Sequence, residues 1–352
     1  MDIKNKKLIK YIIFGLAGFT ILIGLGYLAL TWNKPLNSPL DTPEYVERTD
    51  IVVQTPENEE YTQEPDITLT PTLEPVCGAP PVLNILVSGV ASSNYLYGLA
   101  DAIRVVRVDF QTKEISVLAF PRDLWVDIPG LESRGIEVGK LNQAYFYGTE
   151  GMGYYSGSGY GSGLLADTLY ENFGYRADRY VSVNLNSFRI IIDTLGGIDV
   201  YLASDVYKKE FEEPVLYLKA GSHHLNGKQA EQLARTRITI GDLGRINNQT
   251  VILKALAVKL LSPSGVAALP SLIDQLKSNV QTDLSPADIS QLVCLAGMLN
   301  YDEDIEYFSL PEDSMDEQMV YDPIREINTA ALVVDKDRIY MLIEEFQLGT
   351  LP

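Results

Sequence analysis

The chain has 352 residues, a formal net charge of −19 and a pI near 4.5. Its apolar fraction of 46% is ordinary for a globular protein, so a sizeable core can be buried in one or two domains. Non-specific nucleic-acid binding requires a basic surface, so no nucleic-acid partner is expected for so acidic a chain. Residues 41–74 carry ten acids and one arginine, a net charge of −9. The rest of the chain is therefore only moderately acidic and can hold a basic pocket.

The N-terminal residues predict a membrane anchor. Residues 11–30 are uncharged and mainly apolar, which is the length that crosses a bilayer core, and four lysines lie among residues 4–10. The positive-inside rule makes residues 1–10 a cytoplasmic tail and 11–31 a transmembrane helix, and it places the remainder outside the cell membrane as a single-pass protein. A cleaved signal peptide is the alternative, which the length of the apolar run and the lack of a clear A-x-A site disfavour.

Residues 32–80 are rich in proline, threonine and acids and show little apolar periodicity. This composition is typical of a disordered linker that holds a domain away from the membrane. An extracytoplasmic catalytic domain is predicted over residues 81–352.

Cysteine and histidine are scarce, and this limits the chemistry. The chain has only Cys77, Cys294, His223 and His224 and no CxxC motif, which excludes the usual kinds of zinc site. Outside the membrane the two cysteines can form a disulfide. The alternative is two unrelated cysteines, one of them buried in the core. Sequence separation does not give their distance, so both possibilities stay open.

We expect an α/β fold for this domain, with a mixed central sheet flanked by helices. Predicted strands and helices alternate irregularly along the sequence, and hairpins occur. Strands are expected at residues 82–90, 102–110, 114–120, 124–128, 179–184, 198–202 and 305–311. Helices are expected at residues 164–173, 186–195, 225–234, 244–261, 271–278, 286–299 and 335–345. The segment 148–163 is rich in glycine and tyrosine and predicts a flexible loop, with a mobile lid or an acceptor-contact loop as the alternative.

No Ser-His-Asp or Cys-His arrangement is visible, so the candidate chemistry rests on arginine and aspartate. Guanidinium groups bind phosphate oxygens with several hydrogen bonds at once, a helix N-terminus favours the same anion, and a carboxylate can hold a bridging Mg²⁺ ion. The candidates for such a pyrophosphate site are Asp101, Arg122, Arg235, Arg237, Arg245 and Gln249. Taken singly, each arginine is more often a surface or ion-paired residue, and Arg122–Asp123 and Arg237–Asp242 could be structural pairs.

Taken together and in order, these motifs resemble the LytR-CpsA-Psr family, whose members attach polyprenyl-linked glycopolymers to the cell wall. The resemblance runs from about residue 82 to residue 261. It depends on LADAIRVVRVD, FPRDLWVDIPG, KLNQAYFYG, VNLNSFRIIIDTLGGIDV and LNGKQAEQLARTRITIGDLGRINNQ. It implies an α/β sandwich with a hydrophobic tunnel for an isoprenoid tail.

The resemblance also implies residue roles. Arg122, Arg237, Arg245 and Gln249 match the family's pyrophosphate contacts, with Arg235 assisting, and Arg122, Arg237, Arg245 and Asp101 would be catalytic. Asp101 matches one of the family's two magnesium-binding aspartates. The other usually follows a glycine in a G-x-D step, where this chain has Ala91. The chain also has Ala102 after Asp101 and Asn248 in place of the second arginine of GRxxRQ. These departures predict a weakened Mg²⁺ site, or a Mg²⁺ site of different geometry, beside the arginines that bind the pyrophosphate.

The function expected from the resemblance is transfer of a glycan from a polyprenyl-pyrophosphate carrier to a cell-envelope acceptor, either peptidoglycan or a glycosylated protein, by phosphodiester formation. Asp123 or Asp242 could orient an arginine or accept a proton. The same pocket would also suit a polyprenyl-pyrophosphate phosphatase, in which water replaces the acceptor. Loss of the carboxylate at position 91 leaves a third possibility, a non-catalytic lipid-binding or regulatory protein.

Overall fold

The computed structural model describes residues 31–41, 74–210, 213–236, 241–262, 264–265, 267–268, 271–272, 279–301 and 303–351. In these ranges no helix combines the length and apolarity needed to cross a membrane. The predicted anchor, residues 11–31, lies outside them except for Thr31. Most of the predicted linker and of the helix predicted at 271–278 also lies outside them.

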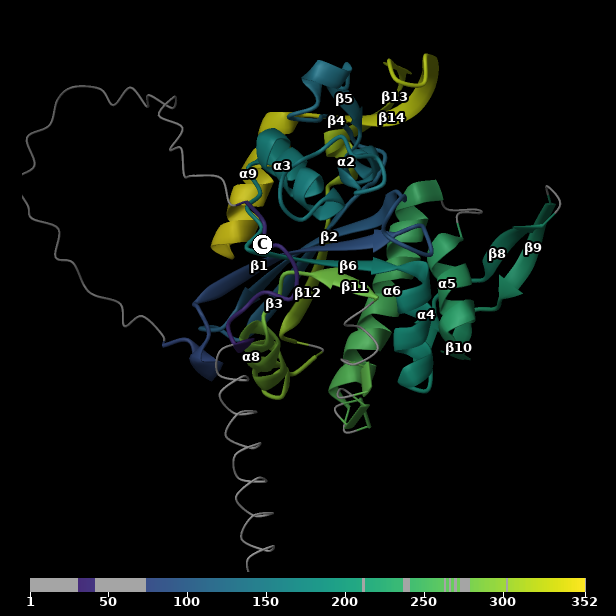
Figure 1. Cartoon of the computed structure of the whole chain (residues 1–352). Helices are drawn as coiled ribbons and strands as arrows, with labels where there is room; N and C mark the ends of the chain where they lie inside the picture. The colour runs from purple at the N-terminus through teal and green to yellow at the C-terminus, as the bar shows by residue number, and fades with distance from the viewer. Residues whose placement is uncertain are drawn as a thin grey trace, which may run out of the picture.

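The described residues form a mixed α/β structure around a six-stranded sheet, as the sequence predicts (Figure 1). The strand order is β11-β6-β1-β2-β3-β12. Their bounds are β1 Val82–Val90, β2 Ala100–Asp109, β3 Glu114–Phe120, β6 Arg179–Asn184, β11 Val280–Thr282 and β12 Ile305–Ser309. The pairs β1–β6 and β3–β12 are parallel and the other pairs are antiparallel.

One face of this sheet is covered by α2 (Leu141–Gly148), α3 (Gly161–Phe173) and α9 (Lys336–Leu348) (Figure 1). Alternate residues of β1 and β2, such as Leu86 and Ile103, point into this core and contact buried side chains such as Leu164. Since side chains alternate across a strand, the intervening residues must pack on the opposite face.

The opposite face is divided between two partners. Near the start of β1, Leu83 and Ile85 pack with Leu295 of α8 (Pro286–Ala296). Near its end the sheet faces α4 (Leu185–Thr194) and α6 (Gly241–Leu261). These two helices, α5 (Gly227–Arg235), β7 (Ile198–Leu202) and β10 (Gly221–Leu225) enclose a second core around Ile192 and Ile252. A Cβ on Gly89 would lie 3.1 Å from the Ala102 Cβ, and these two small residues leave space between the sheet and α6.

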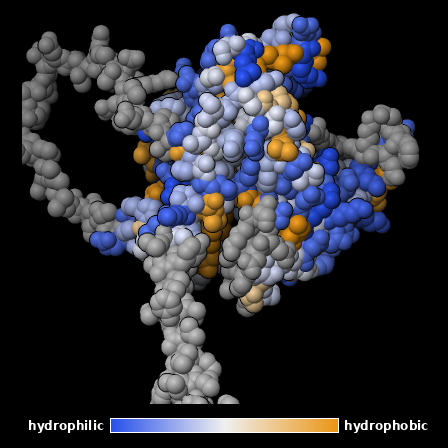
Figure 2. Space-filling model, viewed as in Figure 1, coloured by the Kyte–Doolittle hydropathy of each residue, from blue (hydrophilic) through white to orange (hydrophobic). Residues whose placement is uncertain are grey.

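Three hairpins complete the structure: β4 (Trp125–Asp127) with β5 (Val138–Lys140), β8 (Val206–Glu210) with β9 (Glu213–Leu218), and β13 (Met315–Asp322) with β14 (Ile327–Val334). The β13–β14 hairpin exposes Met319, Ile324 and Ile327. Figure 2 shows apolar patches in that part of the surface. Short 3-10 helices occur at Val76–Gly78, Glu132–Arg134 and Glu312–Ser314.

Several predicted boundaries differ from the structure for local reasons. The helix predicted at 225–234 begins at Gly227, because Gly221–Leu225 pairs with β7 and Asn226 caps the helix by accepting a hydrogen bond from the Gln229 N–H at 2.9 Å. Helix α8 ends at Ala296, before the predicted 299. Strand β2 begins two residues before the predicted start.

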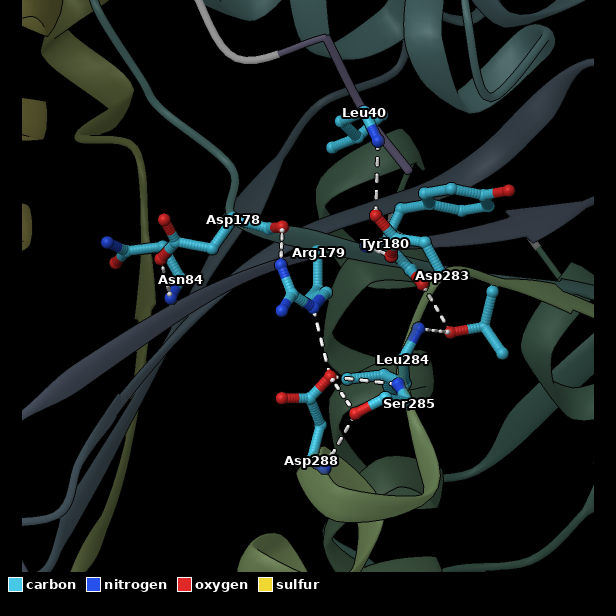
Figure 3. Close-up of polar contacts among 10 residues, drawn as sticks. Leu40, Asn84, Asp178, Arg179, Tyr180, Asp283, Leu284, Ser285 and Asp288 are labelled. Carbon is cyan, nitrogen blue, oxygen red and sulfur yellow. Dashed lines mark hydrogen bonds and ion pairs between the residues drawn. The ribbon is translucent and has the colours of Figure 1, made fainter. Parts of the chain in front are cut away.

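Residues 32–41, the first part of the predicted linker, lie against the domain. The buried Asp283 carboxylate accepts hydrogen bonds from the backbone N–H groups of Leu40 at 3.2 Å and Tyr180 at 2.7 Å (Figure 3). Burial raises the pKa of Asp283, although these hydrogen bonds oppose the rise. The Leu36 N–H also donates to the Leu284 carbonyl at 3.3 Å. One carboxylate thus connects this segment to β6.

Asp288 makes a second connection, from β6 to α8. Its Oδ2 accepts hydrogen bonds from Arg179 Nε at 3.0 Å and from the Ser285 N–H at 2.8 Å, and Ser285 caps α8 in return (Figure 3). Burial alone would raise the pKa of Asp288, but the hydrogen bonds and the Arg179 charge outweigh burial and lower it.

A disulfide joins Cys77 to Cys294, with their Cα atoms 6.0 Å apart. It ties the 3-10 helix before β1 to α8 across 217 residues of sequence. The sequence leaves open whether the two cysteines are paired, and in the structure they form a disulfide.

Replacing both Cys77 and Cys294 by serine should lower the free energy of unfolding by about 2–5 kcal/mol, because the disulfide closes a very long loop in the unfolded chain. Urea unfolding without reductant measures this loss. With dithiothreitol the wild type should unfold at the same urea concentration as the variant. Equal unfolding midpoints without reductant would mean that the two cysteines are not paired.

Asp288→Asn should lower the free energy of unfolding by about 1–3 kcal/mol at pH 7, since it removes a charged acceptor from a partly buried ion pair. Because the pKa of Asp288 is lowered in the folded state, its contribution is complete above the pKa of the unfolded chain and is lost as the pH falls through the folded-state value. The difference from wild type in urea unfolding should therefore be smaller at pH 3 than at pH 7.

Asp335→Asn is the matched control, because Asp335 caps α9 through the Arg338 N–H and asparagine caps helices equally well. It should leave stability nearly unchanged at both pH values. An Asp288→Asn loss of the same size at pH 3 and pH 7 would contradict the role given to the ion pair.

Candidate functional site

A cavity of about 410 Å³ lies between the sheet and α4 and α6. We call it the deep cavity. Its apolar lining includes Val87, Val183, Phe188, Ile252, Leu253 and Leu256. Its polar lining comprises mainly Asp101, Arg104, Glu231, Arg235, Arg245 and Gln249. The deep cavity can therefore contact a hydrocarbon chain along much of its wall, and its arginines supply positive charge in another part of the wall.

Helix α6 provides this separation. Arg245, Gln249, Ile252 and Leu256 follow one another at intervals of four, three and four residues, so they share one face of the helix. The charged side chain lies near the N-terminal end, where the unpaired N–H groups of a helix favour anions, and the apolar ones lie further along.

Two buried arginines meet at the charged part of the cavity. Arg104 of β2 is 3% exposed and Arg245 is 2% exposed. Burial, and secondly the Arg245 charge, lower the pKa of Arg104 to about 10, so it still carries its charge at neutral pH. Arg104 Nη2 donates to Gln249 Oε1 at 3.2 Å, which links the sheet to α6.

Glu231 of α5 accepts hydrogen bonds from Arg189 and, at 3.0 Å, from Arg235. Burial would raise the pKa of Glu231, but these arginines outweigh burial and lower it. Glu231 is therefore ionised and its charge is neutralised by its partners. The side chain of Arg235 is 60% exposed, so it lies at the edge of the deep cavity, whereas Arg245 lies inside.

A second cavity, of about 520 Å³, is lined by Arg122, Asp123, Lys140, Asn142, Tyr154 and Arg325, among others. We call it the polar cleft. An ion pair of 2.7 Å between Arg122 Nη1 and Asp101 Oδ1 connects the two cavities, since Asp101 lines the deep cavity. Asp123 accepts from Arg122 Nε at 3.3 Å and from Lys140 Nζ at 2.9 Å, which fixes the direction of the Arg122 guanidinium.

The structure thus brings Asp101, Arg122, Arg235, Arg245 and Gln249 to one region, from β2, the turn after β3, α5 and α6. Arg237 and the side chain of Asp242 lie outside the residues that it describes. Sequence reasoning missed Arg104. Its signal was an arginine between Ile103 and Val105 in a predicted strand, since an arginine requires a polar partner or a ligand when it is buried.

Among the residues that the structure describes, the side chains at this place do not fit a Mg²⁺ site by themselves. Mg²⁺ prefers oxygen ligands in octahedral geometry. Position 91 lines the deep cavity but is alanine, and Asp101 is already bound by Arg122. In the ranges that the structure describes, no three His, Cys, Asp or Glu residues are grouped closely enough to hold a metal. We therefore assign no reaction step to a metal.

The LytR_cpsA_psr family model matches residues 56–338 of this chain. The polyisoprenyl-teichoic acid–peptidoglycan teichoic acid transferase TagU of Oceanobacillus iheyensis is 31% identical over 60% of this chain and 62% of its own length. The transferase of the same description called TagV, from Bacillus subtilis, is 31% identical over 53% of this chain and 45% of its own length. The matched regions therefore span less than two thirds of these relatives. The regulatory protein MsrR of Staphylococcus aureus is 27% identical over 75% of this chain and 74% of its own length.

Solved structures share the fold. The crystal structure of B. subtilis TagV aligns with a TM-score of 0.59 at 24% identity, covering 78% of this chain and all of that one. TagT bound to a ligand called LIIa-WTA aligns with a TM-score of 0.57 at 21% identity, covering 78% of this chain and 96% of that one.

Leu256→Trp should fill part of the deep cavity and weaken binding of a single-chain anionic lipid, such as dodecyl phosphate, by about tenfold, since the apolar wall would exclude the chain. Calorimetric titration below the micelle concentration measures the affinity. Val258→Trp is the matched control, because Val258 lies on the same helix and is 53% exposed. Equal affinities for the two variants would show that the hydrocarbon chain does not enter the deep cavity.

Proposed function

The chain belongs to the LytR-CpsA-Psr family, and we propose that it transfers a glycan from a polyprenyl-pyrophosphate carrier to a cell-envelope acceptor. One observation carries the proposal: the deep cavity joins an extended apolar wall to two buried arginines. A pyrophosphate attached to a hydrocarbon chain has the same two parts. The names of the TagU and TagV relatives support the class of substrate and acceptor.

The proposed reaction is a displacement at phosphorus. An acceptor hydroxyl oxygen forms a bond to the phosphorus that carries the glycan, and the bond from that phosphorus to the bridging oxygen breaks. The bridging oxygen leaves with the polyprenyl phosphate, and a phosphodiester is formed. Negative charge builds on both phosphates, and fixed arginines in a partly dry cavity would stabilise it, which is commonly the largest contribution to such catalysis.

The polar cleft is the proposed entry for the acceptor. Asp101 lies where the two cavities meet, so it is placed to accept the proton from the acceptor hydroxyl. Arg122, bound to Asp101, would face the reacting phosphate from the cleft side. Asp123 is a positioning residue, since its oxygens bind Arg122 and Lys140.

The proposed location is extracytoplasmic, with residues 11–31 as a membrane anchor. The Cys77–Cys294 disulfide supports it, because disulfides persist in oxidising compartments and are rare in the cytoplasm. An anchor of this kind would keep the domain close to its lipid substrate in the cell membrane.

An activity assay separates transfer from hydrolysis and from binding alone. The full-length chain is incubated with a glycan-bearing polyprenyl pyrophosphate, with and without a peptidoglycan acceptor, and polyprenyl phosphate release is measured. Release that depends on the acceptor supports transfer. Release of polyprenyl phosphate without acceptor would contradict transfer and indicate a phosphatase. Bound lipid without turnover would contradict it and indicate a binding protein.

Arg122→Ala and Arg245→Ala should each lower the rate of turnover by about 10²–10³-fold, because each removes a fixed donor from the phosphates. Arg338→Ala is the control: its ion pair with Asp313 is on the surface, away from both cavities. It should leave the rate unchanged. Full activity in both site variants would contradict the site.

A further inference from the structure

Arg104 has an unusual environment for a buried charge. Its side chain crosses from β2 to α6 and donates to the Ile103 carbonyl at 3.0 Å, Gln249 Oε1 at 3.2 Å and the Ile246 carbonyl at 3.4 Å. All three acceptors are neutral. No carboxylate in the described part of the chain forms an ion pair with Arg104. Most buried charges are paired with an opposite charge, and within the described ranges no carboxylate supplies that charge for Arg104.

Arg245 adds a second buried positive charge near Arg104. Its charge disfavours the charged form of Arg104, and both guanidinium groups are almost fully removed from water. Two like charges in a medium of low dielectric constant repel each other, so the region between them favours an anion. An anion between them would reverse the sign of this interaction. Their shared cavity has room for one.

The carboxylates that line the cavity also favour an anion over a cation. Asp101 and Glu231 are the carboxylates that line it among the described residues, and arginines neutralise both. Ala91 supplies no oxygen from its side chain. A dication placed here would find two carboxylates that arginines already engage and two nearby guanidinium groups that repel it.

We infer that Arg104 is a pyrophosphate-binding residue that takes the place of a metal ion, so that this chain binds its lipid pyrophosphate without Mg²⁺. This inference rests on the proposed function. Arg104 would donate from the sheet while Arg245 donates from α6. Gln249, held by Arg104, would keep the guanidinium directed into the cavity. Charge-assisted hydrogen bonds of this kind are about twice as strong as neutral ones.

The test uses the full-length chain in lipid nanodiscs and geranyl pyrophosphate, a short prenyl pyrophosphate, with affinity measured by calorimetric titration. One buffer contains Mg²⁺ and the other contains EDTA. The wild type should bind with affinities that agree within about threefold in the two buffers. In EDTA, Arg104→Met should lower the affinity by about tenfold or more, the loss expected for a hydrogen bond to a charged group.

Arg107→Met is the matched control. Arg107 lies on the opposite face of β2, is also buried, and pairs with Asp109 at 2.8 Å, away from the deep cavity. It reports the effect of removing a buried arginine from this strand and should leave affinity unchanged. Thermal unfolding of each variant identifies any loss of folded protein.

Wild-type binding that requires Mg²⁺ would overturn the inference and leave the proposed function intact, even where Arg104→Met fails to fold. Unchanged affinity of folded Arg104→Met in EDTA would also overturn it. Absence of wild-type binding in both buffers would overturn the inference and the proposed function together.

Discussion

The site depends on how β1 pairs with its two neighbours. It runs parallel to β6 and antiparallel to β2, so Gly89 lies opposite Val183 on one side and Ala102 on the other. Cross-strand partners point to the same face, so Arg104, opposite Val87, faces the deep cavity with them. A shift of one residue in β2 would turn Arg104 into the core beneath α2 and α3. The register therefore fixes both the space and the charge of the site.

Charge within the site is opposite to that of the chain. The net charge is −19, and about half of it comes from residues 41–74. The deep cavity instead contains two buried arginines, while its carboxylates are neutralised by ion pairs. Burial increases the reach of these arginines, because water no longer screens them. An anion entering the cavity would meet positive potential despite the acidity of the whole protein.

The sequence predicted the parts of the fold that have strong apolar patterns. Strands β1, β3, β6 and β7 coincide with their predictions, since each has a buried apolar side. The β13–β14 hairpin was missed because β13 is mostly exposed and polar, with the sequence MDEQMVYD. Helix α2 was missed although its motif, KLNQAYFYG, was noted. Its buried tyrosines and asparagine give no clear helical stripe, and contacts with α3 stabilise it.

For the site, the ordered arginines could be selected because family motifs mark their positions. Arg104 was not selected, because the resemblance assigned it no role within LADAIRVVRVD and the two arginines of that motif look alike in sequence. Only the pairing of β2 shows that Arg104 faces the deep cavity and that Arg107 faces the other side, with Asp109 as its partner. The sequence could not decide the disulfide for the same reason, since a separation of 217 residues says nothing of the distance between the two cysteines.

A guanidinium that is part of the sheet differs physically from a bound cation. Mg²⁺ must be dehydrated and held by oxygens, and the two carboxylates that line the deep cavity among the described residues are both engaged by arginines. Arg104 is already part of the protein and needs no ligands to hold it. Strand β2 fixes its backbone, and the hydrogen bond to Gln249 orients its guanidinium group without a bound substrate. Its energetic disadvantage is burial beside the like charge of Arg245. Under the proposed function, a pyrophosphate bound between the two guanidinium groups would offset that repulsion, and this relief would add to the affinity.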